Sequence, residues 1–128
     1  MITFCDSSNR QLCIGQTLQH RKGFLGRTKI IRRVRVGIGE HWAEFDYREL
    51  TQDFLGGQQI AESLSSSDGP VFIANVDWAP KSSLFQEQVA GVPEHWWVLC
   101  FMNFETDPVQ AAFSPKDFDE FLSLASEG

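Results

Sequence analysis

Acidic residues at the predicted strand ends, and in the loops between them, are the side chains of this sequence best suited to chemistry. The five of interest are Asp77, Glu87, Glu94, Glu105 and Asp107. A general acid and base pair needs two carboxylates whose pKa values are pushed apart, and no spacing here nominates such a pair. Acidic loops also steer association with a basic protein surface. We therefore predict that these residues bind a partner, and we expect no catalytic residue among them.

Three aromatic residues extend this predicted binding surface. Trp78 and Phe85 lie close in sequence to the acidic positions, while Trp42 alternates onto the charged face of a predicted hairpin. Aromatic side chains ringed by charge are common anchors in protein interfaces. For Trp42 we expect cover by a helix, with contact to a partner as the alternative.

The residues that commonly bind metals or attack substrates stand singly in this chain. They are Cys5, Cys13, Cys100, His20, His41 and His95. No Cys-x-x-Cys, His-x-His or His-x-x-x-His spacing is present, so a zinc site would have to assemble from distant segments. Phosphate-binding and nucleophile-elbow motifs are also missing from the sequence. We accordingly expect reduced thiols, no metal, no cofactor and no enzymatic activity.

The clearest structural pattern is a β-hairpin over 27–50, RTKIIRRVRVGIGEHWAEFDYREL. Apolar and polar residues alternate on both sides of Gly39-Glu40, and a glycine as the first of two loop residues predicts a type II′ turn. This turn places the following residues opposite one another: Ile38 and His41, Val36 and Ala43, Val34 and Phe45, Arg32 and Tyr47, Arg35 and Glu44, and Arg33 and Asp46.

Charge is divided unevenly along the chain. Residues 1–39 hold eight Lys and Arg and one acid, whereas residues 40–128 hold three Lys and Arg and 16 acids, for a net charge of −6. The basic segment 21–35, and above all strand 27–35, is a candidate for contacting phosphates. Because the hairpin places acids opposite two of its arginines, part of this positive field is cancelled. Nucleic-acid binding is therefore the weaker interpretation of the basic run.

Shorter patterns predict the remaining elements. A small hairpin is expected within residues 2–14, and residues 17–26 are interpreted as a loop or a bulged strand. Thr51 is expected to cap a short or broken helix that extends toward Leu64, because Gly56-Gly57 interrupts it. Further strands are predicted at Val71–Trp78, Trp96–Phe104 and Val109–Phe113. The second of these is apolar on both faces, as in a strand covered on each side.

The C-terminal segment carries the signals of a helix. Ser114 is a suitable N-cap, and Pro115 occupies the first helical position, where its missing N–H costs nothing. An apolar stripe then follows at helical spacing: Phe118, Phe121, Leu122 and Ala125. We expect this stripe to lie on a sheet.

Together these elements predict one α+β domain spanning residues 1–128. We expect a mainly antiparallel sheet of about five to seven strands, with the C-terminal helix and a short middle helix packed on it. The hydrophobic fraction of 42% is sufficient for a packed core. The first residues lack the pattern of a signal peptide, and no window approaches about 18 apolar residues. We therefore expect a cytoplasmic protein that does not enter membranes.

The organisation of the chain resembles the small cytosolic immunity proteins of bacterial toxin systems, including those of contact-dependent and type VI secreted effectors. The likeness lies in size, acidity, the single aromatic-rich α+β domain and the ending FSPKDFDEFLSLA (113–125), in which a strand runs directly into a capped helix. The resemblance implies a tight complex with one cognate toxin, whose basic active-site cleft is blocked by acidic and aromatic residues.

The leading functional hypothesis is thus a non-enzymatic, acidic binding protein that neutralises a protein partner. The first alternative is a small-molecule-binding or enzymatic domain with a pocket between the sheet and the C-terminal helix, which would use Asp77 or Glu94 together with His95. The second alternative is a nucleic-acid-binding domain that uses strand 27–35.

Overall fold

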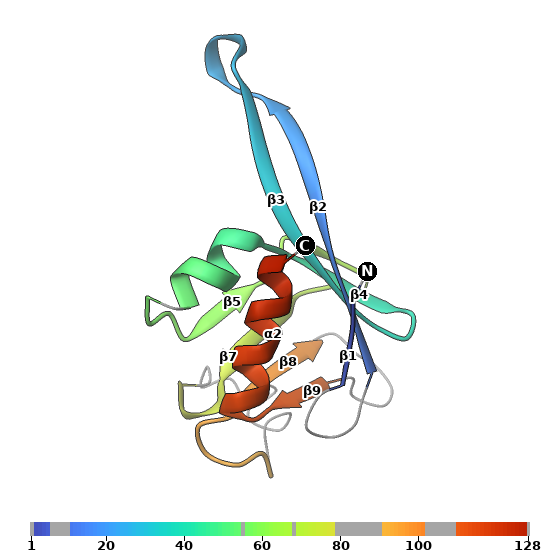
Figure 1. Ribbon diagram of the computed structural model, residues 1–128, viewed down its shortest axis with the longest axis vertical. Helices are drawn as coiled ribbons and strands as arrows, with labels where there is room; N and C mark the ends of the chain where they lie inside the picture. Colours follow the sequence, from blue (N-terminus) through green and yellow to red (C-terminus); the bar gives the residue numbers. More distant parts are fainter. Residues whose placement is uncertain are drawn as a thin grey trace.

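Two antiparallel sheets and a C-terminal helix make up the described part of the chain (Figure 1). The computed structural model describes residues 2–5, 11–54, 56–67, 69–78, 91–101 and 110–127. Sheet A contains, in spatial order, β1 (Ile2–Cys5), β2 (Gln11–Lys22), β3 (Thr28–Ile38), β4 (His41–Asp46) and β6 (Ser65–Ser66). Sheet B contains, in spatial order, β5 (Ile60–Glu62), β7 (Val71–Asn75), β8 (Trp97–Phe101) and β9 (Gln110–Phe113). The helical segments are η1 (Phe24–Gly26), η2 (Glu49–Asp53), η3 (Val76–Trp78) and α2 (Pro115–Glu127).

This architecture confirms the predicted α+β class and its antiparallel pairing. The strands do not form the expected single sheet, however, because most of them pair with a neighbour in sequence. Residues 2–46 build most of sheet A, residues 60–113 supply sheet B, and only the two-residue strand β6 returns from the second segment to pair with β4. Among the described residues, no helix is long and apolar enough to cross a membrane.

The predicted hairpin over β3 and β4 is confirmed in register. Gly39 has φ +60°, as the first position of a type II′ turn requires, and every described pair from Ile38–His41 to Arg33–Asp46 matches the prediction. The small hairpin of β1 and β2 is confirmed as well, with Ile2 opposite Ile14.

The expected loop or bulged strand at residues 17–26 is wrong for residues 17–22, which belong to β2, whereas residues 23–26 form the turn of the ribbon. β2 continues without a bulge as far as Lys22, and it pairs with β3 as far as Thr28. In Figure 1 these two strands rise well beyond the rest of the molecule and end in η1. β4 stops earlier, at Asp46, where it lies opposite Arg33. Residues 18–32, which we call the arm, therefore form a two-stranded ribbon beyond the end of β4.

The middle helix is short, as expected, but its details differ from the prediction. Thr51 does not cap it, since its Oγ1 donates a hydrogen bond to the Tyr47 carbonyl at 2.6 Å inside the helical segment. The helix ends before Gly56 and Gly57, the second of which has φ +105°, and residues 60–62 form β5.

The C-terminal helix confirms the predicted cap and apolar stripe. Ser114 Oγ accepts a hydrogen bond from the Asp117 N–H at 3.2 Å, and the Ser114 carbonyl accepts one from the Phe118 N–H at 2.8 Å. Phe118 stacks on Trp97 of β8, with ring centroids 4.1 Å apart and planes 7° from parallel. Phe121 packs against Phe113 of β9 at 5.2 Å. Aromatic side chains thus fill the space between α2 and sheet B.

The main core joins one face of each sheet with α2 and η2. A smaller cluster covers the other face of sheet B, where Ala74, Val98 and Cys100 pack with partly buried neighbours that include Phe72 and Val76. β8 is consequently buried on both faces, as its apolar sequence predicts.

Candidate functional site

The arm carries apolar side chains that the core does not cover. Alternation along β2 and β3 puts Leu18 and Ile30 on the same sheet face as the buried residues Ile14 and Val34. Within the body this face is buried beneath α2, η2 and sheet B. On the arm, Leu18 is 59% exposed and Ile30 is 57% exposed. The face of sheet A that is buried in the body is therefore exposed to solvent on the arm.

The tip of the arm presents another apolar side chain. Leu25 is 84% exposed, and its φ of +67° is unusual for a residue with a side chain. Gly26 follows at φ +77°, and Arg27 is exposed. The turn thus holds a leucine outward, next to an arginine.

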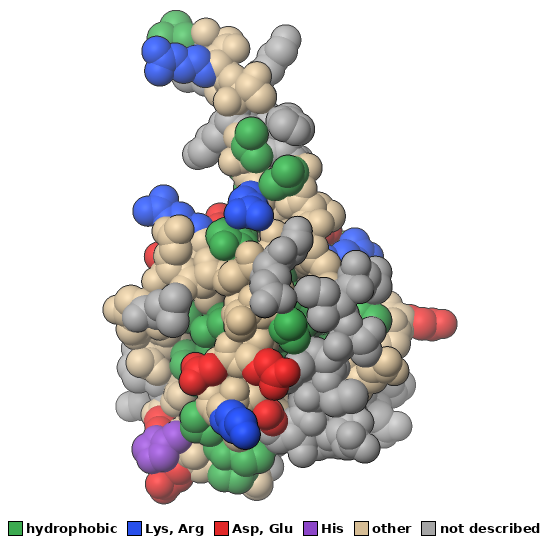
Figure 2. All heavy atoms as spheres, viewed as in Figure 1, with side chains coloured by type: hydrophobic (Ala, Val, Ile, Leu, Met, Phe, Trp, Pro, Cys, Tyr) green, Lys and Arg blue, Asp and Glu red, His purple; other side chains and the backbone are tan. Residues whose placement is uncertain are grey.

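The arm is also strongly basic. Residues 18–32 include five Lys and Arg and no Asp or Glu. Figure 2 shows blue and green side chains on the projecting part of the molecule, whereas the red acidic side chains in this view lie on the body or at the base of the arm. The basic and acidic segments of the sequence are therefore also separated on the surface seen in Figure 2, with basic side chains on the arm and acidic side chains on the body and at the base of the arm.

Among the described side chains, the arginines that have acidic partners lie next to β4. Glu44 lies between two of them, with its carboxylate 3.9 Å from Arg33 Nη1 and 3.6 Å from Arg35 Nη1. Asp46 faces Arg33 in the register, but its Oδ1 accepts a hydrogen bond from the Arg48 N–H at 2.8 Å. The predicted neutralisation of the hairpin thus holds for Arg33 and Arg35, and within the described part of the chain it does not extend to Arg27 and Arg32 of the arm.

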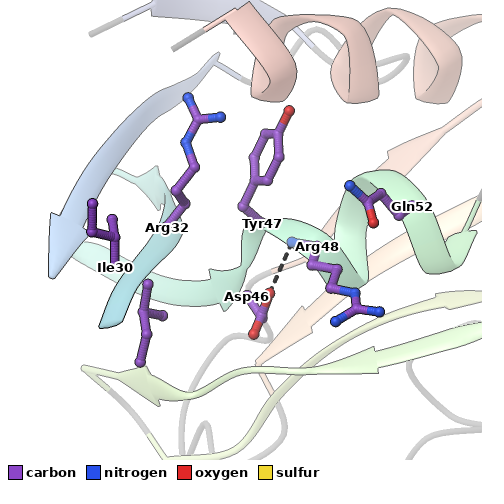
Figure 3. A pocket seen from close by; sticks show the side chains of 7 residues that line it. Ile30, Arg32, Asp46, Tyr47, Arg48 and Gln52 are labelled. Atoms are coloured by element: carbon purple, nitrogen blue, oxygen red, sulfur yellow. Dashed lines mark hydrogen bonds between the residues drawn. The ribbon is translucent and has the colours of Figure 1, made fainter. Parts of the chain in front are cut away.

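A pocket of about 450 Å³ lies where the arm leaves β4 (Figure 3). Its lining residues are Ile30, Ile31, Arg32, Asp46, Tyr47, Arg48 and Gln52. The Arg32 guanidinium stacks over the Tyr47 ring at 4.5 Å and donates a hydrogen bond to Gln16 Oε1 at 3.2 Å. Figure 3 shows Arg32 and Tyr47 pointing to one side of the pocket, and Asp46 to the other. The site therefore combines an apolar wall with one arginine that is already held in place.

Trp42 lies on the charged face of the hairpin, as predicted, but the expected helix does not cover it in the described part of the chain. The Arg35 guanidinium stacks over its ring at 4.1 Å instead. A pocket of about 320 Å³ beside this pair has three glycines in its lining, Gly15 of β2, Gly37 of β3 and Gly39 of the turn. A Cβ on Gly15 would meet no atom within 4 Å. Trp42 therefore borders an open, shallow surface that a partner can reach.

The structure brings Asp77 and His95 together from 18 residues apart. Asp77 Oδ2 lies 2.6 Å from His95 Nδ1, and Asp77 Oδ1 accepts the His95 N–H at 3.0 Å. The backbone hydrogen bond from His95, joined by its ring, lowers the pKa of Asp77 below the usual value. His95 has φ +69°, a strained conformation that this pair of contacts helps to hold.

An aspartate that fixes a histidine ring is an arrangement used in general-base catalysis. Here the His95 side chain is 74% exposed, so water surrounds the ring. Glu94, the neighbouring acid, is exposed too. The first alternative hypothesis placed such a group in a pocket between the sheet and the C-terminal helix, a space that aromatic side chains fill in the structure. The pair therefore lies at the surface, outside the space between α2 and sheet B that the aromatic side chains fill.

The remaining predicted site residues are only partly described. Trp78 lies in η3, directly after Asp77. Phe85, Glu87, Glu105 and Asp107 lie outside the described residues. Their predicted role in binding stays a prediction.

The cysteines differ in their surroundings. Burial in sheet B raises the pKa of the Cys100 thiol to about 12, whereas Cys13 is half-buried and lines the pocket beside Trp42. Because only a thiolate reacts readily, we expect iodoacetamide at about pH 8 to modify Cys13 in the folded protein and to leave Cys100 untouched. Peptide mass spectrometry would measure both, with the unfolded protein as the control in which both react. Equal labelling of the two in the folded protein would contradict the burial of Cys100.

Within the described residues, no three His, Cys, Asp or Glu side chains gather in a way that would hold a metal ion. Comparison of the chain with protein-family models, with curated proteins and with solved structures found no match. The candidate site therefore rests on the geometry of the molecule, in which the arm and the pocket at its base are the most distinctive surface.

Proposed function

We propose that this chain is a non-enzymatic binding protein that engages a protein partner through the arm. The observation that carries the proposal is the pair Leu18 and Ile30, which continue the core face of sheet A yet stay 59% and 57% exposed. Contiguous exposed apolar surface, especially when rimmed by charge, is typical of interaction sites.

The stability of the arm supports the same conclusion. An isolated two-stranded ribbon is marginally stable in water, and it gains stability by packing its apolar face against something else. In the body, sheet A obtains this support from the core. On the arm, the corresponding support for Leu18 and Ile30 comes from the bound partner.

The resemblance to toxin-immunity proteins makes a toxin the partner to test first. In that form of the proposal the arm enters or covers the toxin, and the acidic and aromatic residues predicted from the sequence contact a second, basic part of it. Asp77 and Glu94 are exposed and available for this role. Acidic groups at an interface rim mainly increase the rate of association.

The experiment removes the apolar surface of the arm without disturbing the core. In the double variant Leu18→Ser/Ile30→Ser, affinity for the partner should fall on the order of tenfold to a hundredfold, since full burial of one such side chain contributes roughly 1.5–3 kcal/mol. The matched control is Leu64→Ser, which removes a leucine that is 49% exposed on the body. The measurement is calorimetric titration with the partner, beginning with the product of the adjacent gene, and includes rescue of growth if that product is toxic.

Two outcomes would contradict the proposal. One is an equal loss of affinity in the arm variant and in the Leu64→Ser control. The other is the absence of any stoichiometric protein partner, both from the source cell and on co-expression with the adjacent gene.

A second candidate function is favoured by the charge of the arm. Arg27 and Arg32 are exposed and lie beyond β4, so the pairing with Glu44 that weakens this reading for Arg33 and Arg35 does not apply to them. A two-stranded ribbon also fits the DNA major groove. This candidate requires affinity for a DNA duplex that falls steeply with salt and that Arg27→Glu abolishes.

A further inference from the structure

Within the part of the chain that the structure describes, one edge of β3 is left unpaired along the arm. β4 pairs with β3 only as far as Arg33, whereas β3 itself continues to Thr28. Over the segment 28–32, the strand that pairs with β3 within the described residues is β2, on the opposite edge. An unpaired edge is a template for the backbone of another strand.

The register shows which backbone groups face this open edge. In a two-residue hairpin the closing pair, here Ile38 and His41, exchanges both hydrogen bonds, so even-numbered residues of β3 point their N–H and C=O groups toward β4. Odd-numbered residues point toward β2, as the Gly23 N–H to Arg27 carbonyl bond confirms at the tip. Past the end of β4, Ile30 and Thr28 therefore direct both of their backbone groups outward.

The pocket of about 450 Å³ lies at this same edge. Ile30, Ile31 and Arg32 contribute one wall from β3. Asp46 at the end of β4 and the residues that follow it contribute the other. Figure 3 shows that the chain turns away from β3 here into η2, which leaves the pocket at the place where β4 would otherwise have continued. The pocket thus lies where a longer β4 would have paired with β3.

We infer that this edge receives an extended, acidic segment of the protein partner, which adds to sheet A as a strand in line with β4. The inference rests on the proposed function and specifies how the partner is recognised. Thr28 and Ile30 supply backbone hydrogen bonds, and alternate side chains of the added strand fall on the two faces of the arm. One set lies on the same face as Ile30 and Arg32, where carboxylates reach Arg32, and the other set lies on the opposite face beside Ile31.

Charge identifies the chemistry of the added strand. Residues 18–32 carry five Lys and Arg and no acid, and Arg48 adds an exposed arginine to the pocket. The Arg32 side chain is held by Tyr47 and Gln16, so little further ordering is needed when it pairs with a carboxylate. A second copy of this chain is a poor occupant of the edge, because two arms side by side would bring like charges together.

The test uses a synthetic peptide of about eight residues in which Val and Glu alternate, a length typical of one strand. Binding is measured by fluorescence anisotropy against a second peptide in which Lys replaces Glu. The key variant is Ile30→Pro, which removes the N–H that faces the open edge and leaves the bonds between β2 and β3 in place. We expect this variant to bind the acidic peptide about tenfold more weakly or worse, as loss of a backbone bond at the site predicts.

His20→Pro is the control. His20 lies opposite Ile30 in the register, but its N–H points to the opposite edge of the arm, beyond the end of β1. The affinity of His20→Pro should stay within about threefold of the unsubstituted protein, because this substitution removes no N–H that faces the open edge. Circular dichroism would show that both variants fold.

A second measurement needs no substitution. On addition of the acidic peptide, amide hydrogen exchange should slow at Thr28 and Ile30, the residues whose N–H groups face the open edge. Slower exchange at these amides together with selective weakening by Ile30→Pro supports the inference. Equal effects of the two proline variants, equal binding of the lysine peptide, or unchanged exchange at Thr28 and Ile30 would overturn it.

The outcomes separate this inference from the proposed function. If the identified partner binds in a manner that depends on the apolar side chains of Leu18 and Ile30 while Ile30→Pro has no effect on it, strand addition is wrong and the partner-binding function stands. If a DNA duplex binds the arm and the acidic peptide does not, both are overturned in favour of the nucleic-acid candidate.

Discussion

Replacement of Phe118 by alanine is expected to lower the free energy of unfolding by about 3–5 kcal/mol, the usual cost of removing a buried phenylalanine. Phe118 is only 3% exposed. Its ring stacks on Trp97 and also lies within 6.0 Å of Phe54, Phe113 and Phe121, measured between ring centroids. The substitution therefore removes a side chain of α2 that packs against both Phe54, at the end of η2, and sheet B. A loss of this size is a large part of the roughly 5–15 kcal/mol that stabilises a typical domain.

Urea unfolding followed by circular dichroism would measure the effect. The matched control is Ser123→Ala, an exposed position on the same helix, for which a change within about 0.5 kcal/mol is expected. A loss below about 1 kcal/mol for Phe118→Ala would show that α2 is not part of the core.

The parts of the fold that the sequence predicts well are those fixed by local signals. Gly39-Glu40 sets the register of the β3–β4 hairpin because a type II′ turn needs a positive φ at its first position, and Gly39 has φ +60°. The same holds for α2, where Ser114 and Pro115 mark the start and the spacing of phenylalanines marks the buried face. These signals act over a few residues and are readable without knowing the rest of the chain.

The arm was missed for a physical reason. Strand alternation in a sequence arises from burial of one face. The described side chains of the arm that continue the core face, Leu18 and Ile30, are exposed, and the segment TLQHRK at 17–22 shows no alternation. A signal was nevertheless present on the other side of the turn. Residues 28–32 continue the strand pattern of β3 past the point where β4 can pair with it. This segment therefore needs another strand as its partner, and in the structure that partner is β2.

The Asp77–His95 pair illustrates the second limit. The sequence predicts strands close to those of the structure on either side of this pair, but a long connection separates them and no tight turn sets their register. In the structure Asn75 lies opposite Trp97, and this places Asp77 within reach of His95. The register of these two strands depends on the whole sheet. Both residues could therefore be proposed as site residues from the sequence, but their contact at the surface could not be predicted.

Charge reversal at Arg33 is the second large effect that we expect. The Arg33 side chain is 20% exposed, Glu44 is 15% exposed, and Asp46 lies directly opposite Arg33 in the register. Glutamate at this position would replace one ion pair by repulsion from both acids. We expect Arg33→Glu to lower the free energy of unfolding by about 2–3 kcal/mol, between the roughly 0.2–1 kcal/mol of an exposed cross-strand pair and the roughly 3–5 kcal/mol of a broken buried pair.

The control for this prediction is the same charge reversal at an arginine of the arm. Arg27 is exposed at the tip, so Arg27→Glu should leave the melting temperature unchanged and weaken binding of the acidic partner. The double variant Arg33→Glu/Glu44→Arg should regain only part of the lost stability, because it restores one opposite-charge pair but replaces the Arg35–Glu44 pair by two neighbouring arginines. If Arg33→Glu instead kept the melting temperature and lost binding, Arg33 would belong to the binding surface, and the division of the basic run into a neutralised part beside β4 and an available part on the arm would be wrong.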